Sequence, residues 1–259
     1  MTRLEVRTPV FIDADNTLWD TNAVFADAQR AVLADVAHAL GIALDASHDL
    51  DFIRAIDQAI ASRHHAGLRY PVSLLIRGLE LALDGASPEI AARTAWSGGR
   101  NYRIDSESVG EIESRYFEKL SALPALRGGV IEGLDWLRAR GCLLYVVTEG
   151  AKPTVQRTAD RLGLADYFDR VIAAPKTAEL YQRVLRLAGA PRLAFMIGDQ
   201  LDRDIAPANA AGLRTIYFPG GFQPKWLPGV EDAKPAYVVS SFSDVPEVLE
   251  REITQLTSR

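Results

Sequence analysis

The sequence predicts an α/β protein, in which a parallel sheet is covered by helices on both faces and an all-helical module is inserted into it. Short apolar, β-branched runs alternate with helical patterns over residues 127–259, which is typical of parallel strands joined by helices. One more such run lies at 8–12, and only helical patterns fill the chain from about 20 to 126. We therefore expect residues 1–19 and 127–259 to form one α/β core, with residues 20–126 as an inserted helical module.

Each predicted strand or helix follows from a local pattern of apolar residues. Strands are predicted where apolar residues run without interruption, at 8–12, 142–147, 170–174, 193–197, 214–218 and 236–240. Helices are predicted where apolar residues recur every three or four positions. In the inserted module they begin at Thr21 and recur at 52–60, 71–83, 87–96 and 105–123; in the core they lie at 130–141, 154–164, 177–189, 204–212 and about 244–255.

Composition narrows the class of protein. Of the 259 residues, 48% are hydrophobic and 24% are charged, which is ordinary globular composition. The net charge of −5 argues against a nucleic-acid or anionic-membrane partner. Cys142 is the one cysteine, which excludes a disulfide within the chain and fits a reducing cytoplasm. We see no signal peptide and no stretch near the roughly 20 apolar residues of a membrane span, so we expect a cytoplasmic protein, monomer or homodimer.

Polar side chains follow four of the predicted strands where each strand ends. They are Asp13 and Asp15; Thr148, Glu149 and Gly150; Lys176; and Asp199 and Asp204. Ligands of open parallel sheets bind beyond the carboxyl ends of the strands, so we expect these residues to share one rim. Clustered carboxylates need a cation, and oxygen ligands favour Mg²⁺. A lysine and a threonine hydroxyl can hold phosphoryl oxygens, so the pattern predicts a site for Mg²⁺ and a phosphate.

These residues carry a family resemblance. Asp13-Ala14-Asp15-Asn16-Thr17, Thr148, Lys176 and the segment GDQLDRD (198–204) resemble, in order, the four motifs of the haloacid dehalogenase (HAD) superfamily. The chain looks most like the phosphatase-type members, which carry a helical cap after the first motif. The resemblance covers the whole chain and implies a Rossmann-like core with residues 20–126 as the cap.

The resemblance also implies roles. Asp13 would be the nucleophile that forms an aspartyl-phosphate, and Asp15 would be the general acid and then the base. Thr148 and Lys176 would hold the phosphoryl group, helped by backbone N–H groups near Glu149 and Gly150. The implied ligands of Mg²⁺ are Asp13, Asp15 through its backbone carbonyl, Asp199 and Asp204.

Some residues depart from the pattern or stay open. Glu149 stands where an asparagine is common, and it either points away from the phosphate or rejects some substrates. Lys176 lacks the proline-rich run that often follows it in relatives, but Lys152, the competing lysine, comes too early in the order. In the cap, Arg63, His64, His65 and Arg69 either recognise an anionic substrate or form a solvated helix end.

The expected activity is Mg²⁺-dependent hydrolysis of a small phosphate monoester through an aspartyl-phosphate, with a small phosphorylated metabolite as substrate. An alkoxide leaving group needs a proton and a halide does not, so an acid at position 15 favours phosphate esters over dehalogenation. The alternatives are a phosphomutase on the same scaffold and, behind it, a dehalogenase or a non-catalytic binding protein.

Overall fold

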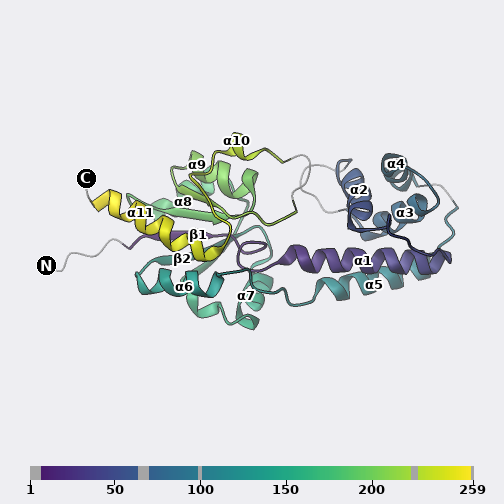
Figure 1. Cartoon of the computed structure of the whole chain (residues 1–259), viewed down its shortest axis with the longest axis horizontal. Coiled ribbons are helices and arrows are strands. Elements are labelled where there is room, and N and C mark those ends of the chain that lie inside the picture. The colour runs from purple at the N-terminus through teal and green to yellow at the C-terminus, as the bar shows by residue number, and fades with distance from the viewer. Residues whose placement is uncertain (1–6, 64–69, 99–100, 223–226, 258–259) are drawn as a thin grey trace. The chain divides into compact units, whose positions relative to one another are not determined.

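The structure is a computed structural model, which describes residues 7–63, 70–98, 101–222 and 227–257. The chain divides into two compact units, Met1–Asn22 with Leu123–Arg259 and Ala23–Ala122. The larger unit is the α/β core and the smaller one is helical, and each has a hydrophobic core of its own. Figure 1 shows the elements of both units.

The core unit is built on a six-stranded sheet, in the order β3-β2-β1-β4-β5-β6, and all its pairings are parallel. The strands are β1 (Pro9–Ile12), β2 (Leu143–Thr148), β3 (Arg170–Ala173), β4 (Phe195–Gly198), β5 (Arg214–Tyr217) and β6 (Tyr237–Val238). The chain leaves β1 for β2 on one side and returns to β4 on the other. This reversal is the point at which open parallel sheets bind ligands, and the predicted fold class is confirmed.

Helices cover both faces of the sheet (Figure 1). They are α6 (Val130–Ala139), α7 (Lys152–Arg161), α8 (Ala178–Leu187), α9 (Ala206–Ala210), α10 (Val230–Ala233) and α11 (Val245–Thr257). Successive strand residues point to opposite faces. Val10 and Ile12 of β1 therefore join one apolar cluster, with residues of α6, α7 and α11. Phe11 joins a second cluster, with Tyr181 of α8 and Ala208 of α9.

Some boundaries differ from the predicted ones. A π-helical turn occupies Leu201–Ile205, so that α9 begins at Ala206 and the helix predicted at 204–212 is shorter than expected. The Asp204 carboxylate accepts the N–H of Gln200, the residue before this turn, at 3.0 Å. β6 pairs with β5 alone and over two residues, which makes it shorter than the predicted 236–240. The short helix α10 was not predicted.

The helical unit confirms the predicted run of helices. They are α1 (Thr21–Leu40), α2 (Leu50–Ala61), α3 (Val72–Leu83), α4 (Pro88–Ser97) and α5 (Ser106–Leu120). Their starts follow capping chemistry: Asp49 and Ser87 accept backbone N–H groups of α2 and α4. Gly78 lets α3 approach α2, because a Cβ there would lie 3.0 Å from Ile56 Cγ2. That this unit acts as a cap stays a prediction.

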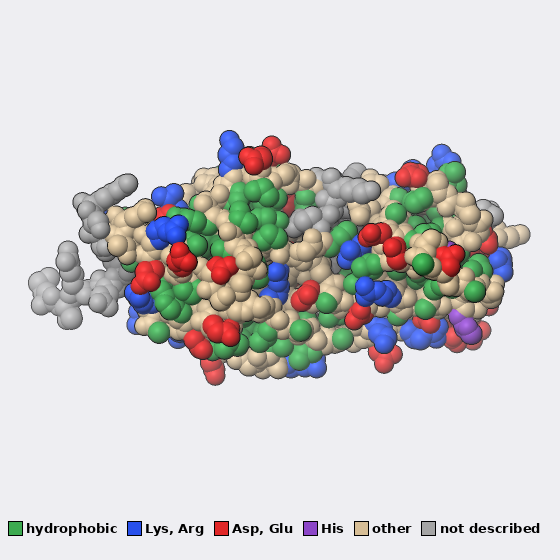
Figure 2. Space-filling view, in the orientation of Figure 1, with side chains coloured by type: hydrophobic (Ala, Val, Ile, Leu, Met, Phe, Trp, Pro, Cys, Tyr) green, Lys and Arg blue, Asp and Glu red, His purple; other side chains and the backbone are tan. Residues whose placement is uncertain are grey.

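The surface carries charges of both signs. On the face shown in Figure 2, lysine and arginine side chains are interspersed with aspartate and glutamate. Among the residues that the structure describes, no helix combines the length and the apolar character that crossing a membrane requires.

Candidate active site

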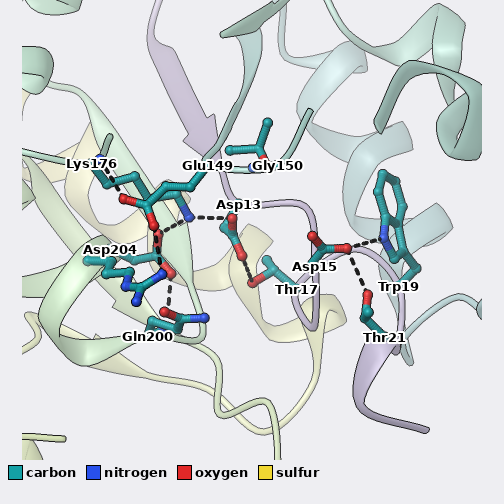
Figure 3. A network of polar contacts seen from close by, with 12 residues as sticks. Asp13, Asp15, Thr17, Trp19, Thr21, Glu149, Gly150, Lys176, Gln200 and Asp204 are labelled. Atoms are coloured by element: carbon teal, nitrogen blue, oxygen red, sulfur yellow. Dashed lines mark hydrogen bonds and ion pairs between the residues drawn. The ribbon is translucent and has the colours of Figure 1, made fainter. Parts of the chain in front are cut away.

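The sheet brings the predicted site residues to one rim. Asp13 directly follows β1, Thr148 is the last residue of β2, and Asp199 directly follows β4. The N–H of Asp13 donates to the carbonyl of Ile197 at 2.9 Å, so the hydrogen bonding between β1 and β4 continues into the site. Lys176 lies in the loop between β3 and α8. Figure 3 shows that Asp13, Lys176 and Asp204 converge here.

The centre of the site is a buried cluster of charges. Lys176 is 8% exposed, and its Nζ contacts Asp13 Oδ1 directly and Asp204 Oδ1 at 2.6 Å. Burial alone would lower the pKa of Lys176, but the carboxylates of Asp13 and Asp204 outweigh that effect and raise it. The lysine is therefore charged. Buried charges persist only when they are paired, which explains why a lysine is tolerated at this depth.

The carboxylates of the site outnumber its cation. Burial raises the pKa of Asp13 above its ordinary value; Lys176 opposes this effect and Asp204 adds to it. Burial also raises the pKa of Asp199, with Asp13 and Asp204 adding to the effect. One lysine against three ionised carboxylates would leave an excess of negative charge in a dry site, which a divalent cation would balance.

The donor set fits such a cation. Asp13, Asp199 and Asp204 each offer a carboxylate oxygen, and these atoms lie within 4.8 Å of one another. Two glycines allow the side chains to approach. A Cβ at Gly198 would overlap the Asp204 side chain, and a Cβ at Gly220 would overlap that of Asp199. An all-oxygen set of this kind suits Mg²⁺. The Asp15 carboxylate is not part of this group, and the expected use of its backbone carbonyl stays a prediction.

Asp15 is held separately from the charge cluster. Its Oδ1 accepts hydrogen bonds from Trp19 Nε1 at 2.9 Å and from Thr21 Oγ1 at 2.7 Å, as Figure 3 shows. The turn that allows this places Asn16 at a φ of 61°, a left-handed conformation that asparagine tolerates better than most residues. The other oxygen, Oδ2, lies toward Gly150, where it would be 3.8 Å from an added Cβ. One carboxylate oxygen is thus fixed, while the other faces the end of β2.

Three of the predicted phosphate-binding residues, Thr148, Glu149 and Gly150, lie at that strand end. Thr148 is buried, and its Oγ1 accepts the N–H of Gly150 at 2.9 Å. Glu149 points elsewhere: its carboxylate accepts the N–H of Lys176 at 2.9 Å and contacts Arg203 at 2.7 Å. The Glu149 carboxylate is thus directed at the Lys176 backbone and at Arg203. The roles of these residues stay predictions.

Three residues near the site were not predicted to act there. Trp19 and Thr21 orient Asp15 through hydrogen bonds to its Oδ1. Arg127 ties two loops together, because it donates to the carbonyl of Asn16 and, at 2.9 Å, to that of Pro219. No local pattern separates Arg127 from a surface arginine. Of the open cap residues, Arg63 is exposed, whereas His64, His65 and Arg69 lie outside the described residues.

Comparison with known proteins supports one family. Residues 10–212 match the family described as haloacid dehalogenase-like hydrolase, and this range covers all the site residues above. The chain belongs to this hydrolase family. The confirmed resemblance extends to the fold: a haloacid dehalogenase-like hydrolase from Xanthomonas campestris superposes with a TM-score of 0.63 at 22% identity, covering 98% of this chain and 99% of that one.

Curated relatives of this hydrolase bear phosphatase names. A ribulose-1,5-bisphosphate 5-phosphatase from Halopiger xanaduensis is 27% identical over 82% of this chain and 84% of its own length. A glyceraldehyde 3-phosphate phosphatase from Methanopyrus kandleri is 25% identical over 95% of this chain and 98% of its own length. At this coverage, both matches must include residues of the α/β unit and of the helical unit.

Proposed function

We propose that this HAD-like hydrolase is a phosphatase that cleaves phosphate monoesters of small metabolites through an aspartyl-phosphate. The observation that carries the proposal is that two aspartates close in the sequence, Asp13 and Asp15, have different surroundings. Asp13 is buried beside the charged Lys176, whereas Asp15, two residues on, is held by Trp19 and Thr21 with one oxygen left over. One carboxylate is thus suited to attack and the other to proton transfer.

In the first step, a carboxylate oxygen of Asp13 attacks phosphorus and the bond from phosphorus to the ester oxygen breaks. Asp15 gives its proton to that oxygen, and the alcohol leaves. Lys176 and Thr148 hold the phosphoryl oxygens, and Lys176 stabilises the negative charge that spreads over them. Such positioning and electrostatic stabilisation provide most of the catalysis of phosphoryl transfer.

In the second step, Asp15 is ionised and takes a proton from a water molecule that attacks the phosphorus of the aspartyl-phosphate. The bond between phosphorus and the Asp13 oxygen breaks, and inorganic phosphate and the free carboxylate result. Asp13, Asp199 and Asp204, with the backbone carbonyl of Asp15, would hold Mg²⁺. When bound, the ion would supply positive charge that draws the phosphate and the nucleophile together.

The relatives support the substrate class. The names of the relatives above describe phosphatases that act on small phosphorylated sugars. An acid at position 15 also favours phosphate-ester hydrolysis over dehalogenation, because a departing alkoxide needs a proton and a departing halide does not.

The test is the hydrolysis of p-nitrophenyl phosphate by the wild type and by Asp13→Asn, each with Mg²⁺ and with EDTA. We expect turnover that needs Mg²⁺ and that falls at least about a thousandfold in Asp13→Asn, because the amide is a poor nucleophile. Acid quenching should trap labelled phosphate on the wild type but not on the variant. Turnover that survives in Asp13→Asn would contradict the mechanism.

A further inference from the structure

Glu149 is an acidic residue directly after Thr148, next to the proposed phosphate site. Its Oε1 accepts the backbone N–H of Lys176 at 2.9 Å, and its Oε2 accepts Nη1 of Arg203 at 2.7 Å. Figure 3 shows the carboxylate directed at the Lys176 loop and not at Asp13. The negative charge is thus balanced by an arginine, so it opposes a bound phosphate less than a free carboxylate would.

The two hydrogen-bond partners of Glu149, Lys176 and Arg203, lie in the segments that contain Lys176 and Asp204 of the charge cluster. Lys176 lies in a loop between β3 and α8, outside any helix or strand, so no ladder or helix fixes its backbone. Its N–H instead bonds to the Glu149 side chain, while its Nζ reaches Asp13 and Asp204. Arg203 directly precedes Asp204 in the π-helical turn after β4. The Glu149 carboxylate therefore joins the end of β2 to both loops.

We propose that Glu149 is a positioning residue, which holds the backbone of Lys176 so that its Nζ stays between Asp13 and Asp204. The inference deepens the proposed function and rests on it, because it assigns how the phosphate-neutralising lysine is kept in place. Arg203, in the turn after β4, forms an ion pair with Glu149. We call the contacts of Glu149 with the Lys176 backbone and with Arg203 the clamp.

The exposure of the Glu149–Arg203 ion pair indicates whether the loss of Glu149 should affect stability or catalysis. The side chains of Glu149 and Arg203 are 32% and 42% exposed, and ion pairs at such exposure stabilise a fold little. Geometry is more sensitive than stability, since a displacement of about 1 Å at a catalytic group can cost on the order of a hundredfold in rate. Removing Glu149 should therefore change the chemistry of the site more than the free energy of unfolding.

The chain offers a matched control. Asp169 also accepts a backbone N–H, that of Leu144 at 2.8 Å, and also pairs with an arginine, Arg138, at 3.1 Å. The side-chain exposures are 30% and 42%, nearly those of the Glu149 pair. Asp169 directly precedes β3, however, and so lies at the opposite end of the sheet from the site. Asp169→Ala removes the same kinds of contact without touching the clamp.

The first readout is kinetic, on p-nitrophenyl phosphate. Glu149→Ala should lower kcat by about 10- to 100-fold with a smaller change in KM, as is usual when a supporting contact to a catalytic group is lost. Glu149→Gln keeps an oxygen for the Lys176 N–H, so its kcat should recover to within a few-fold of the wild type, the size expected for an exposed ion pair. Arg203→Met should resemble Glu149→Gln, and Asp169→Ala the wild type.

The second readout needs no turnover. Acetylation by an N-hydroxysuccinimide ester, followed by peptide mass spectrometry, measures how accessible each lysine is. The buried Lys176 should react slowly in the wild type relative to the exposed Lys119 and Lys234. Its relative rate should rise several-fold in Glu149→Ala, while Asp169→Ala should leave it unchanged. If Glu149→Ala does not fold, Glu149→Met, of similar length, takes its place.

The two readouts separate the inference from the function on which it rests. A fall in kcat and a rise in Lys176 labelling that are specific to Glu149→Ala support the clamp. Equal behaviour of Glu149→Ala and Asp169→Ala in labelling overturns it, whatever the activity. If the wild type hydrolyses no phosphate ester, the proposed function fails, and the labelling comparison still decides whether Glu149 positions Lys176.

Discussion

At the scale of single residues, two aspartates that lie two positions apart have different surroundings. Asp13 is 4% exposed and bonded to a lysine, whereas Asp15 makes its contacts with the neutral side chains of Trp19 and Thr21. Burial raises the pKa of Asp13 and Lys176 opposes this rise, while the hydrogen bonds from Trp19 and Thr21 fix the orientation of the Asp15 carboxylate. In the proposed mechanism, these different surroundings would suit Asp13 to act as the nucleophile and Asp15 to act as the acid.

The indole of Trp19 provides a test of this orientation. Trp19→Phe keeps most of the buried ring but removes the 2.9 Å hydrogen bond from Nε1 to Asp15. We expect kcat to fall roughly tenfold, the effect of losing one hydrogen bond to a charged group. KM should change little, and a leaving group that needs less protonation, such as p-nitrophenol, should be affected less than an alkyl alcohol. Equal losses for both leaving groups would contradict a role through Asp15.

At the scale of elements, three segments of the helical unit meet at one partly buried carboxylate. Asp57 of α2 accepts hydrogen bonds from Tyr70, which precedes α3, and from Gln29 of α1 at 3.4 Å. Burial raises the pKa of Asp57, and the hydrogen bonds from Tyr70 and Gln29 offset this only in part. The polar contact thus ties the helices together, but at a cost when the carboxylate is ionised.

The sign of the pH effect follows from the raised pKa. The folded state holds the Asp57 proton more tightly than the unfolded state, so the stabilising contribution is present below about pH 4 and is lost as the pH rises through the folded-state pKa. Asp57→Asn keeps an acceptor and cannot titrate. We expect its urea midpoint, relative to that of the wild type, to increase from pH 4 to pH 8. A difference that does not change with pH, or that falls, would contradict the shift.

At the scale of the whole molecule, the described part of each unit has apolar clusters of its own. Apolar residues from both faces of the sheet surround β1 in one unit, and the helices of residues 23–122 enclose the other. The charge cluster belongs entirely to the α/β unit, because Asp13, Asp199 and Asp204 all follow its strands. A ligand of that cluster should therefore stabilise one unit directly.

Calorimetry with and without Mg²⁺ tests this division. An ion at a hundred times its Kd adds about 2.7 kcal/mol, which corresponds to about 5–10 °C in the Tm of the α/β unit. We expect two thermal transitions, of which only one moves to higher temperature with Mg²⁺. Asp199→Asn should abolish the shift, whereas Asp202→Asn in the same loop should keep it. Equal shifts of both transitions would contradict independent cores.

Much of this architecture is encoded locally. The strands follow from short uninterrupted apolar runs and the helices from apolar residues that recur every three or four positions, and both patterns depend only on near neighbours in the chain. The site residues Asp13, Thr148 and Asp199 could be recognised because each stands where an apolar run ends, and parallel strands gather such ends at one rim. The family motifs marked Lys176 as well, although it follows a short strand in a loop.

Only the tertiary structure decided the contacts that make these residues a site. Lys176 meets Asp13 across 163 positions because the parallel order β3-β2-β1 brings the loop after β3 to the same rim as the end of β1. The direction of Glu149, the link made by Arg127 and the hold of Trp19 on Asp15 all depend on which side chain lies beside which after folding. Periodicity records whether a residue is buried, but a hydrogen bond depends on distance and angle between atoms, and these exist only once the chain has packed.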